Sequence, residues 1–286
     1  MVNGNTELIE GEVWVKDDTI EYIGPKKEHA DIWDREIDIC RDVILPGFKN
    51  AHTHSAMTFL RSYADDLALQ DWLFDKVFPM EGKLTKEDQY ELSKLAILEY
   101  LTSGITTNFD MYLSNDTHAH SSSEMGYRTV LCGSMNDFGG TVEEMEEEYL
   151  KYNSYHPLIS AQIGFHAEYT TKKETLKKLV TLTQKYKAPI YTHLAETKKE
   201  VDECIERYGM TTMKFLDAIG MFEYGGGGFH CVHLNDEDIE IAARKGISIV
   251  TNPASNLKLA SGIAPLCKMV EKGMNLAIGT DGPASN

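Results

Sequence analysis

Short runs rich in β-branched and apolar residues recur along the chain from Val43 onward, and each has the length of a buried strand. Segments of helical period separate them. Eight such runs are present, at 43–54, 104–112, 127–135, 158–167, 188–196, 227–234, 247–255 and 275–282. Strands that alternate with helices indicate a parallel sheet, and eight strands are the number that closes a barrel. We therefore predict an α/β fold, a (β/α)₈ TIM barrel over 46–286.

The segments between these runs carry helix boundary signals. The segment at 85–104 begins with Thr85 as a candidate N-cap, has Asp88 three residues later, and ends at Gly104 as a candidate C-cap. The segments at 172–186 and 236–246 also read as helices. The acidic run at 143–149 is best explained as a solvated helix face.

The two ends of the chain differ from this pattern. Apolar and polar residues alternate on both sides of Asp17 and Asp18, which predicts a small hairpin within a separate segment at 1–45. The eighth run ends at Asp281, and only five residues follow. No helix can cover that strand, so we expect the final barrel helix to be missing and the chain to be cut short.

Composition narrows the possible partners. The 286 residues carry a formal net charge of −17, which disfavours nucleic acid and anionic membranes. No apolar run approaches a membrane span, and the N-terminus lacks the layout of a signal peptide. The five cysteines are far apart, without a CxxC pair, which is typical of reduced thiols in a cytoplasmic protein.

A pair of histidines ends the first strand of the predicted barrel. His52 and His54 are two residues apart, so in a strand both imidazoles project from one face, at the end where barrel active sites lie. Such a pair makes half of a zinc site, although it could also be a surface or capping pair. His118 and His120 have the same spacing in a segment that we expect to begin a helix, where the two rings diverge.

Further candidate ligands stand at other strand ends. His193 ends the fifth run with Glu196 just beyond it, and Asp281 ends the eighth. His230 and His233 lie three apart in the sixth, so strand alternation lets only one face the lumen. Each could be a core histidine, a helix cap or a turn residue. Together at one rim, three imidazoles and a carboxylate around an open position would form a catalytic zinc site.

Long segments of the chain resemble the amidohydrolase superfamily. They are PGFKNAHTHSAMTFLRSYADD, THLAETKKE, FHCVHL, NPASNLKLASGIAP and GTDGPASN, in that order between Val43 and the last residue. The most similar branch contains the deaminases of 5′-methylthioadenosine and S-adenosylhomocysteine, with triazine hydrolases as close relatives. In that family a last helix completes the barrel and both chain ends build a small β-sandwich, so the resemblance implies that residues 1–45 are part of a sandwich.

The resemblance also implies roles for individual residues. His52, His54, His193 and Asp281 would bind one divalent metal, zinc or iron, since no lysine at the end of the fourth run could bridge a second. The metal would activate a water molecule whose proton Asp281 accepts, Glu196 would be the proton shuttle, and His230 would orient the attacking hydroxide, which leaves His233 structural. This implies a hydrolytic deaminase that releases ammonia from a purine nucleoside.

The implied substrate pocket contains four further residues. Trp72 would pack on the sugar or its 5′ substituent, although its helix-like apolar surroundings suit a core residue equally well. Glu81 would accept hydrogen bonds from the ribose hydroxyls, His166 would contact a ring nitrogen of the base, and Ser285 would lie near the same pocket.

One departure from the family pattern bears on the substrate. Relatives that act on S-adenosylhomocysteine bind its carboxylate with arginines after the third strand. Here Gly133 stands at one such position, and no arginine occurs between Arg128 and Arg207. We therefore expect small neutral 5′ groups, as in adenosine, 5′-deoxyadenosine or 5′-methylthioadenosine. The alternatives are hydrolysis of a triazine, a pterin or guanine on the same site, and an inactive fragment. Whether the chain forms a homo-oligomer stays open.

Overall fold

The structure is a computed structural model, and it describes residues 9–29, 32–64 and 67–285. The first eight residues of the predicted N-terminal segment and the last residue of the chain, Asn286, lie outside the described residues. The chain divides into two compact units, Met1–Gly47 and Phe48–Asn286, which we describe separately.

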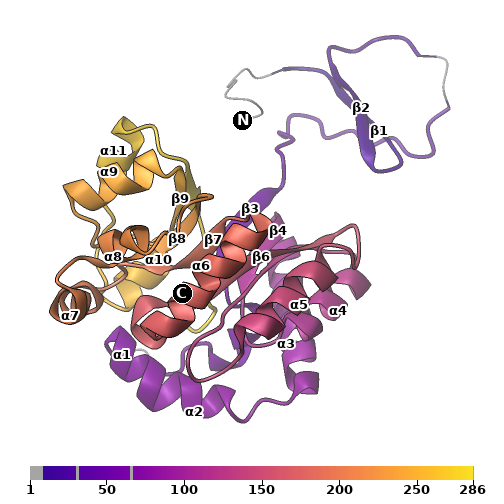
Figure 1. Ribbon diagram of the computed structural model, residues 1–286. Helices are drawn as coiled ribbons and strands as arrows, with labels where there is room; N and C mark the ends of the chain where they lie inside the picture. The colour runs from indigo at the N-terminus through magenta and orange to yellow at the C-terminus, as the bar shows by residue number, and fades with distance from the viewer. Residues whose placement is uncertain (1–8, 30–31, 65–66, 286) are drawn as a thin grey trace. The chain divides into compact units, whose positions relative to one another are not determined.

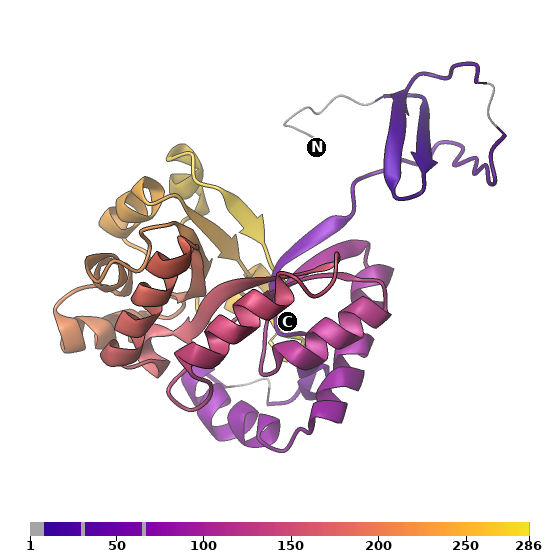
Figure 2. The ribbon, with the colours of Figure 1, turned by 45° about the vertical axis from the view of Figure 1, so that its right-hand side comes forward.

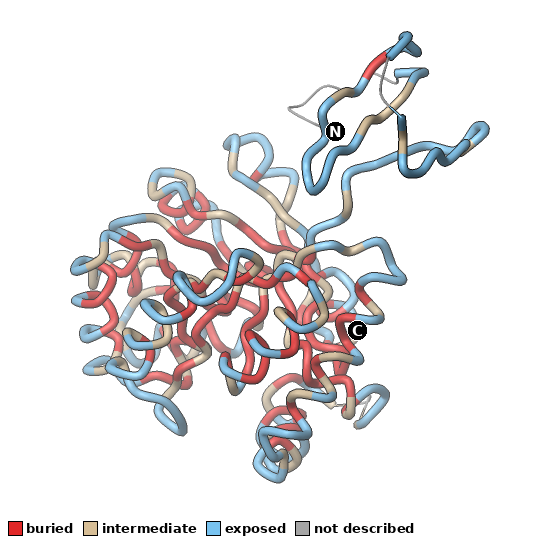
Figure 3. The backbone as a smooth tube through the Cα atoms, turned by 90° about the vertical axis from the view of Figure 1, so that its right-hand side faces the viewer, coloured by how far each residue is buried: buried red, intermediate tan, exposed pale blue. Residues whose placement is uncertain are grey.

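The first unit contains a small hairpin. Strands β1 (Glu12–Lys16) and β2 (Thr19–Gly24) pair antiparallel, as the alternation around Asp17 predicts, and Asp17 takes a left-handed conformation with φ of 53° in the turn. The Trp14 ring packs on Tyr22 with 4.7 Å between centroids. Most of this unit is exposed (Figure 3). That it is part of a sandwich remains a prediction.

The second unit contains eight parallel strands in the order of the sequence, which confirms the predicted barrel (Figure 1). They are β3 (Phe48–Thr53), β4 (Ile105–Met111), β5 (Arg128–Cys132), β6 (Ile159–Ala167), β7 (Ile190–Leu194), β8 (Gly226–His230), β9 (Ile247–Thr251) and β10 (Leu276–Ile278). Seven of the eight predicted runs contain one of these strands, and the remaining strand, β8, begins one residue before its predicted run.

The barrel closes between its first and last strands. The amide of Asp281, three residues after β10, donates to the carbonyl of His52 on β3 at 3.0 Å. The Asn50 side chain donates to the Thr280 hydroxyl at 2.7 Å and accepts from the Thr280 amide at 2.9 Å. Two strands that are more than 220 residues apart in the sequence are thereby joined. Residues 279–285 after β10 form loop and turn, and the missing last helix remains a prediction.

Helices surround the strands, and their buried faces cover the outside of the barrel (Figures 2 and 3). The α-helices are α1 (Leu69–Trp72), α2 (Phe78–Glu81), α3 (Lys86–Thr102), α4 (Asn115–Glu124), α5 (Val142–Tyr152), α6 (Lys173–Tyr186), α7 (Lys198–Tyr208), α8 (Thr212–Ala218), α9 (Asp236–Arg244), α10 (Pro253–Lys258) and α11 (Leu266–Glu271). Shorter turns are the 3₁₀ segments η1 (Ser55–Leu60) and η3 (Glu168–Thr170) and the π-helical turn η2 (Leu73–Val77).

Local chemistry explains where these elements begin and pack. Thr85 and Asp88 form a reciprocal capping box at the start of α3, and Gly104 ends that helix with φ of 75°, as predicted. The glycines of β8 allow close strand packing, since a Cβ on Gly226 would lie 1.9 Å from the Ile190 carbonyl oxygen. Inside the barrel, Met111, Cys132, Phe229 and Val250 form a buried apolar cluster. None of the described helices is both long enough and apolar enough to cross a membrane.

Candidate metal centre

Four predicted ligands meet at the C-terminal rim of the barrel. One nitrogen from each imidazole and one carboxylate oxygen lie within 4.8 Å of one another, from His52, His54, His193 and Asp281. Asp281 Oδ1 is 3.3 Å from His52 Nε2 and 3.1 Å from His54 Nε2. Within the described ranges, this is the only set of three or more such side chains that could share a metal ion.

Backbone carbonyls fix how two of these imidazoles are turned. His54 Nδ1 donates to the Met111 carbonyl, and His193 Nδ1 donates to the His166 carbonyl at 2.7 Å. With Nδ1 protonated, Nε2 of each ring keeps its lone pair for a ligand, which is the usual outer arrangement of metal-binding histidines. His52 is held by packing instead, because its ring stacks on Phe229 with 3.8 Å between centroids.

Unpartnered buried atoms show that a cation fits this group. Both ring nitrogens of His52 and the Oδ1 of Asp281 are buried and have no hydrogen-bond partner among the described residues. Asp281 Oδ2, in contrast, accepts from the hydroxyls of Ser255 at 2.6 Å and Ser285 at 2.7 Å. Because an unpaired buried polar atom is costly, the three free atoms indicate a ligand, and three nitrogens with one oxygen suit zinc.

The electrostatics of the group agree with this reading. Burial lowers the pKa of His52 to about 3, against the opposing contact with Asp281, and burial lowers the pKa of His193 well below its usual value. Both are neutral at pH 7, as metal binding requires. For His54, burial lowers the pKa but the Asp281 carboxylate outweighs it, so the pKa rises to about 9. A metal ion would compete with that proton, and its binding would release it.

Glu196 and His230 lie beside the four ligands. Glu196 is 3% exposed, and burial raises its pKa well above the usual range. Its Oε1 is 3.6 Å from His230 Nδ1. His230 Nδ1 contacts the Asn256 Oδ1 at 2.7 Å, and since an amide oxygen only accepts, this nitrogen carries the proton and Nε2 is an acceptor. His233 lies beyond the end of β8 and contacts the Ser261 carbonyl instead, so the turn after the strand, rather than alternation within it, separates the two histidines.

Left-handed backbone conformations occur at this rim. Ala195, His230, Cys231 and Asp281 have φ between 49° and 69°, although none is glycine. Such residues cost about 1–3 kcal/mol each and persist where surrounding contacts hold them. Here the amide of Cys231 donates to the Leu194 carbonyl at 3.0 Å and that of His233 to the Ala195 carbonyl at 2.8 Å. These four residues lie at or just after the ends of β7, β8 and β10, where the chain turns at the rim that carries the ligands.

Three of the ligands, His54, His193 and Asp281, line one cavity at this rim. All four residues predicted for the substrate pocket line it, namely Trp72, Glu81, His166 and Ser285. Trp72 is also part of the apolar cluster of the neighbouring helices, and its contact with a sugar stays a prediction. The Ser285 hydroxyl is used on Asp281. Among the described lining residues there is no lysine or arginine.

Two residues that the sequence analysis did not single out support the site. Glu200 is fully buried, and its carboxylate accepts from the amides of Ala195 at 2.8 Å and Glu196 at 2.9 Å. Burial raises its pKa to about 8, against those two hydrogen bonds. Asn256 fixes the His230 ring. The spacing of Thr197 and Glu200, typical of a capping box, is the sequence signal that could have indicated Glu200.

Comparison with known proteins agrees with this geometry. The model of the amidohydrolase family matches residues 43–286. The chain belongs to the amidohydrolase family. A curated member of it from Thermoanaerobacter pseudethanolicus, named 5-methylthioadenosine/S-adenosylhomocysteine deaminase, is 42% identical over 96% of this chain and 65% of its own length. This chain therefore spans about two thirds of that relative.

Two solved structures have a similar fold. An adenosine deaminase from Xanthomonas campestris with bound zinc superposes with a TM-score of 0.79 and 34% identity, over 84% of this chain and 57% of the other. A guanine deaminase from C. acetobutylicum reaches a TM-score of 0.87 at 23% identity, over 96% of this chain and 70% of the other, and shows the fold alone.

Proposed function

We propose that this chain is a zinc-dependent hydrolytic deaminase of adenosine-type nucleosides. The observation that carries the proposal is the buried Glu196 carboxyl, in one cavity with a three-histidine, one-aspartate metal group. Relatives named 5-methylthioadenosine/S-adenosylhomocysteine deaminase and adenosine deaminase support it. Iron could replace zinc at the same ligands.

A metal ion held by the four ligands supplies Lewis acidity that makes water a nucleophile near neutral pH. Asp281 would accept the proton that this water loses, while the hydroxyls of Ser255 and Ser285 hold its carboxylate in place through Oδ2. The acceptor Nε2 of His230 orients the attacking oxygen. Glu196, kept protonated by burial, donates to the ring nitrogen beside the amino-bearing carbon. The hydroxyl adds to that carbon, and Asp281 passes its proton to the amino group, which leaves as ammonia. The hydroxyl on the carbon then returns a proton to Glu196, and the aminopurine becomes a keto purine.

His230 and His233 provide a matched test of these roles. We expect His230→Ala to lower kcat by about 10²-fold, because the attacking oxygen loses an orienting acceptor. His233→Ala should leave kcat nearly unchanged, since its contact is with the Ser261 carbonyl. Steady-state kinetics on the folded, zinc-loaded variants would measure both. Equal losses in the two variants would contradict the assigned roles.

The cavity suits a nucleoside without an anionic tail. Gly133 leaves no room for a longer side chain, because a Cβ there would lie 2.2 Å from the Met145 side chain and 2.9 Å from the Gly164 carbonyl. Glu81 is buried, and burial raises its pKa. It lines the cavity as an acceptor for ribose hydroxyls. The carboxylate of S-adenosylhomocysteine would meet no described cationic side chain there.

His166 also lines the cavity, in a defined tautomer. The Thr170 hydroxyl donates to the Ala167 carbonyl, so it must accept from His166 Nδ1, at 2.9 Å. Burial lowers the pKa of His166 to about 4, so the ring is neutral at pH 7 and Nε2 is an acceptor. We propose that His166 contacts the base in this cavity, as the resemblance implies.

Ammonia release from a panel of nucleosides and bases tests the function. We expect the highest kcat/KM for adenosine, 5′-deoxyadenosine or 5′-methylthioadenosine, a lower value for S-adenosylhomocysteine, and little activity on guanine or a triazine. Glu81→Gln should raise KM for nucleosides and leave KM for a free base unchanged. The highest kcat/KM for S-adenosylhomocysteine would refute the pocket argument, and zinc binding without ammonia release from any compound would refute the deaminase.

The net charge and the composition support a proposal about the partners and the location of the protein. We propose a small-molecule substrate, no nucleic-acid partner and a cytoplasmic location, on the basis of the net charge of −17 and the separated cysteines. Assembly into a homo-oligomer stays a prediction for size measurements in solution.

A further inference from the structure

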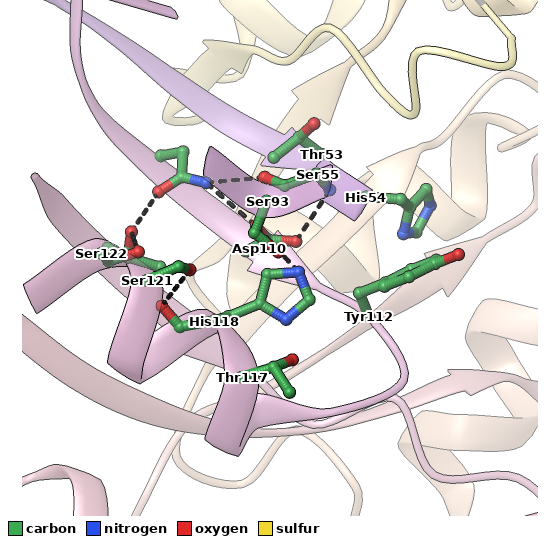
Figure 4. Close-up of polar contacts among 12 residues, drawn as sticks. Thr53, His54, Ser55, Ser93, Asp110, Tyr112, Thr117, His118, Ser121 and Ser122 are labelled. Carbon is green, nitrogen blue, oxygen red and sulfur yellow. Dashed lines mark hydrogen bonds and ion pairs between the residues drawn. The ribbon is translucent and has the colours of Figure 1, made fainter. Parts of the chain in front are cut away.

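A buried polar network lies behind the metal group, on the side of β4. Asp110 is only 2% exposed, and its Oδ1 accepts from the amide of Ser55 at 3.1 Å. Asn108 donates through Nδ2 to Asp110 Oδ2 at 3.1 Å and to the Ser55 hydroxyl at 3.2 Å. Figure 4 shows Asp110 and Ser55 joined in this way, with His54 next along the chain. Asp110, Asn108 and Ser55 do not line the cavity.

Asp110 is tied to His54 from both directions along the chain. Ser55, whose amide it binds, directly follows His54. Met111, which directly follows Asp110, offers the carbonyl that accepts from His54 Nδ1. Residues 110–111 of β4 therefore hold both the backbone that follows His54 and the His54 ring itself. A change in the Asp110 carboxylate would release one of these two restraints.

The network continues to Asp281 as a chain of hydroxyls with a fixed direction. Thr53 donates its only hydroxyl hydrogen to the Asp281 carbonyl at 3.0 Å. It must then accept from Tyr100, at 2.8 Å, and Tyr100 must accept from Ser55, at 2.9 Å. Ser55 in turn accepts from Asn108. One directed path thus runs from Asn108, which also donates to Asp110, through Ser55, Tyr100 and Thr53 to the backbone carbonyl of Asp281 after β10.

This path crosses the seam where the barrel closes. His54 comes from the end of β3 and Asp281 from the end of β10, and their contact depends on how these two strands are held together. We propose that Asp110, with Asn108, Ser55, Tyr100 and Thr53, is a positioning network that sets the affinity of the site for its metal ion. The proposal rests on the proposed metal-dependent function.

The surroundings of Asp110 make it sensitive to replacement. His118 Nε2 is 3.9 Å from Asp110 Oδ2, buried and without a hydrogen-bond partner among the described residues, while its Nδ1 donates to the Ser114 carbonyl. An asparagine at position 110 would place an NH₂ group against either the Ser55 amide or the Asn108 Nδ2, because both are donors to the carboxylate. Asp110→Asn therefore breaks the network with almost no change in volume.

The test measures metal binding directly. We expect Asp110→Asn to raise the Kd for Zn²⁺ about 10- to 100-fold, as loss of outer contacts to ligands does elsewhere. We also expect its Co²⁺ form to show shifted and weaker visible bands. Asp116→Asn is the matched control, because its exposed carboxylate contacts Lys151 and Tyr152 on the outer surface, and it should keep wild-type values. Competition with a chromogenic chelator and Co²⁺ spectra give both readouts without substrate.

An Asp110→Asn protein with wild-type zinc affinity and an unchanged Co²⁺ spectrum would overturn the proposal, even if its deaminase activity fell. If circular dichroism shows that this variant is unfolded, Tyr100→Phe decides with the same readouts. It removes only the hydroxyl between Thr53 and Ser55 and should weaken zinc binding severalfold, whereas wild-type binding would overturn the proposal. A wild-type chain with the expected metal affinities but no ammonia release would reject the deaminase and leave the network standing.

Discussion

Replacing Glu196 with glutamine is expected to lower kcat by about 10²- to 10⁴-fold and to leave the metal bound. Glutamine has nearly the same volume but no proton to give to the ring nitrogen. Glu196 is also absent from the four-ligand group, so zinc affinity should not change. Ammonia release on zinc-loaded protein, together with metal analysis, measures both. Glu206→Gln, an exposed position on α7, is the control for the substitution itself.

Because Glu196 acts only when it is protonated, the activity should fall at high pH. Burial raises the pKa of Glu196 well above its usual value, and the nearby Asp281 carboxylate raises it further. Below that pKa the group is protonated and can act as the acid, so kcat/KM should fall as the pH rises through it. A Glu196→Gln enzyme with full activity, or a wild-type kcat/KM that climbs steadily to high pH, would remove Glu196 from the mechanism.

Replacing His54 with alanine is expected to abolish stable zinc binding and to lower activity by about 10³-fold or more, because the metal accounts for several kcal/mol of transition-state stabilisation. The protein contains its own control. His120 has the same position in a second HxH motif, but it lies exposed on α4 while His118 is buried, so these two rings diverge as expected on a helix. His120→Ala should therefore keep one zinc ion and full activity.

Metal content after dialysis against a weak chelator, and ammonia release with added zinc, distinguish the two variants. Equal zinc retention by His54→Ala and His120→Ala would show that the ion is bound elsewhere. Recovery of full activity by His54→Ala in excess zinc would show that His54 is dispensable as a ligand.

The strands and their order could be predicted because their signals are local. Each strand is a short apolar run between helical segments, and parallel alternation admits few arrangements. The capping box at Thr85 and the left-handed conformation of Gly104 likewise depend on residues that are close in the sequence. The short helices α8 and α11 carry weaker signals, with no side-chain cap, and the sequence analysis did not predict them.

The residues of the site likewise differ in whether adjacent residues in the sequence indicate them. The ligands could be found because His52 and His193 lie one residue before the ends of β3 and β7 and Asp281 follows β10, and the ends of parallel strands meet at one rim. Asn256 and Asp110 could not, since each acts on a partner 26 or 55 residues away, His230 and the Ser55 amide. Such pairings depend on the folded backbone, including left-handed turns at His230 and Asp281 that no local pattern announces.

The central claim is that these four side chains hold one metal ion, and a zinc-edge anomalous difference map of zinc-loaded crystals tests it most directly. The account predicts one strong peak about 2.0–2.2 Å from a nitrogen of His52, His54 and His193 and from an oxygen of Asp281. A peak bound by other side chains, or no peak at this rim in protein that carries one equivalent of zinc, would contradict it.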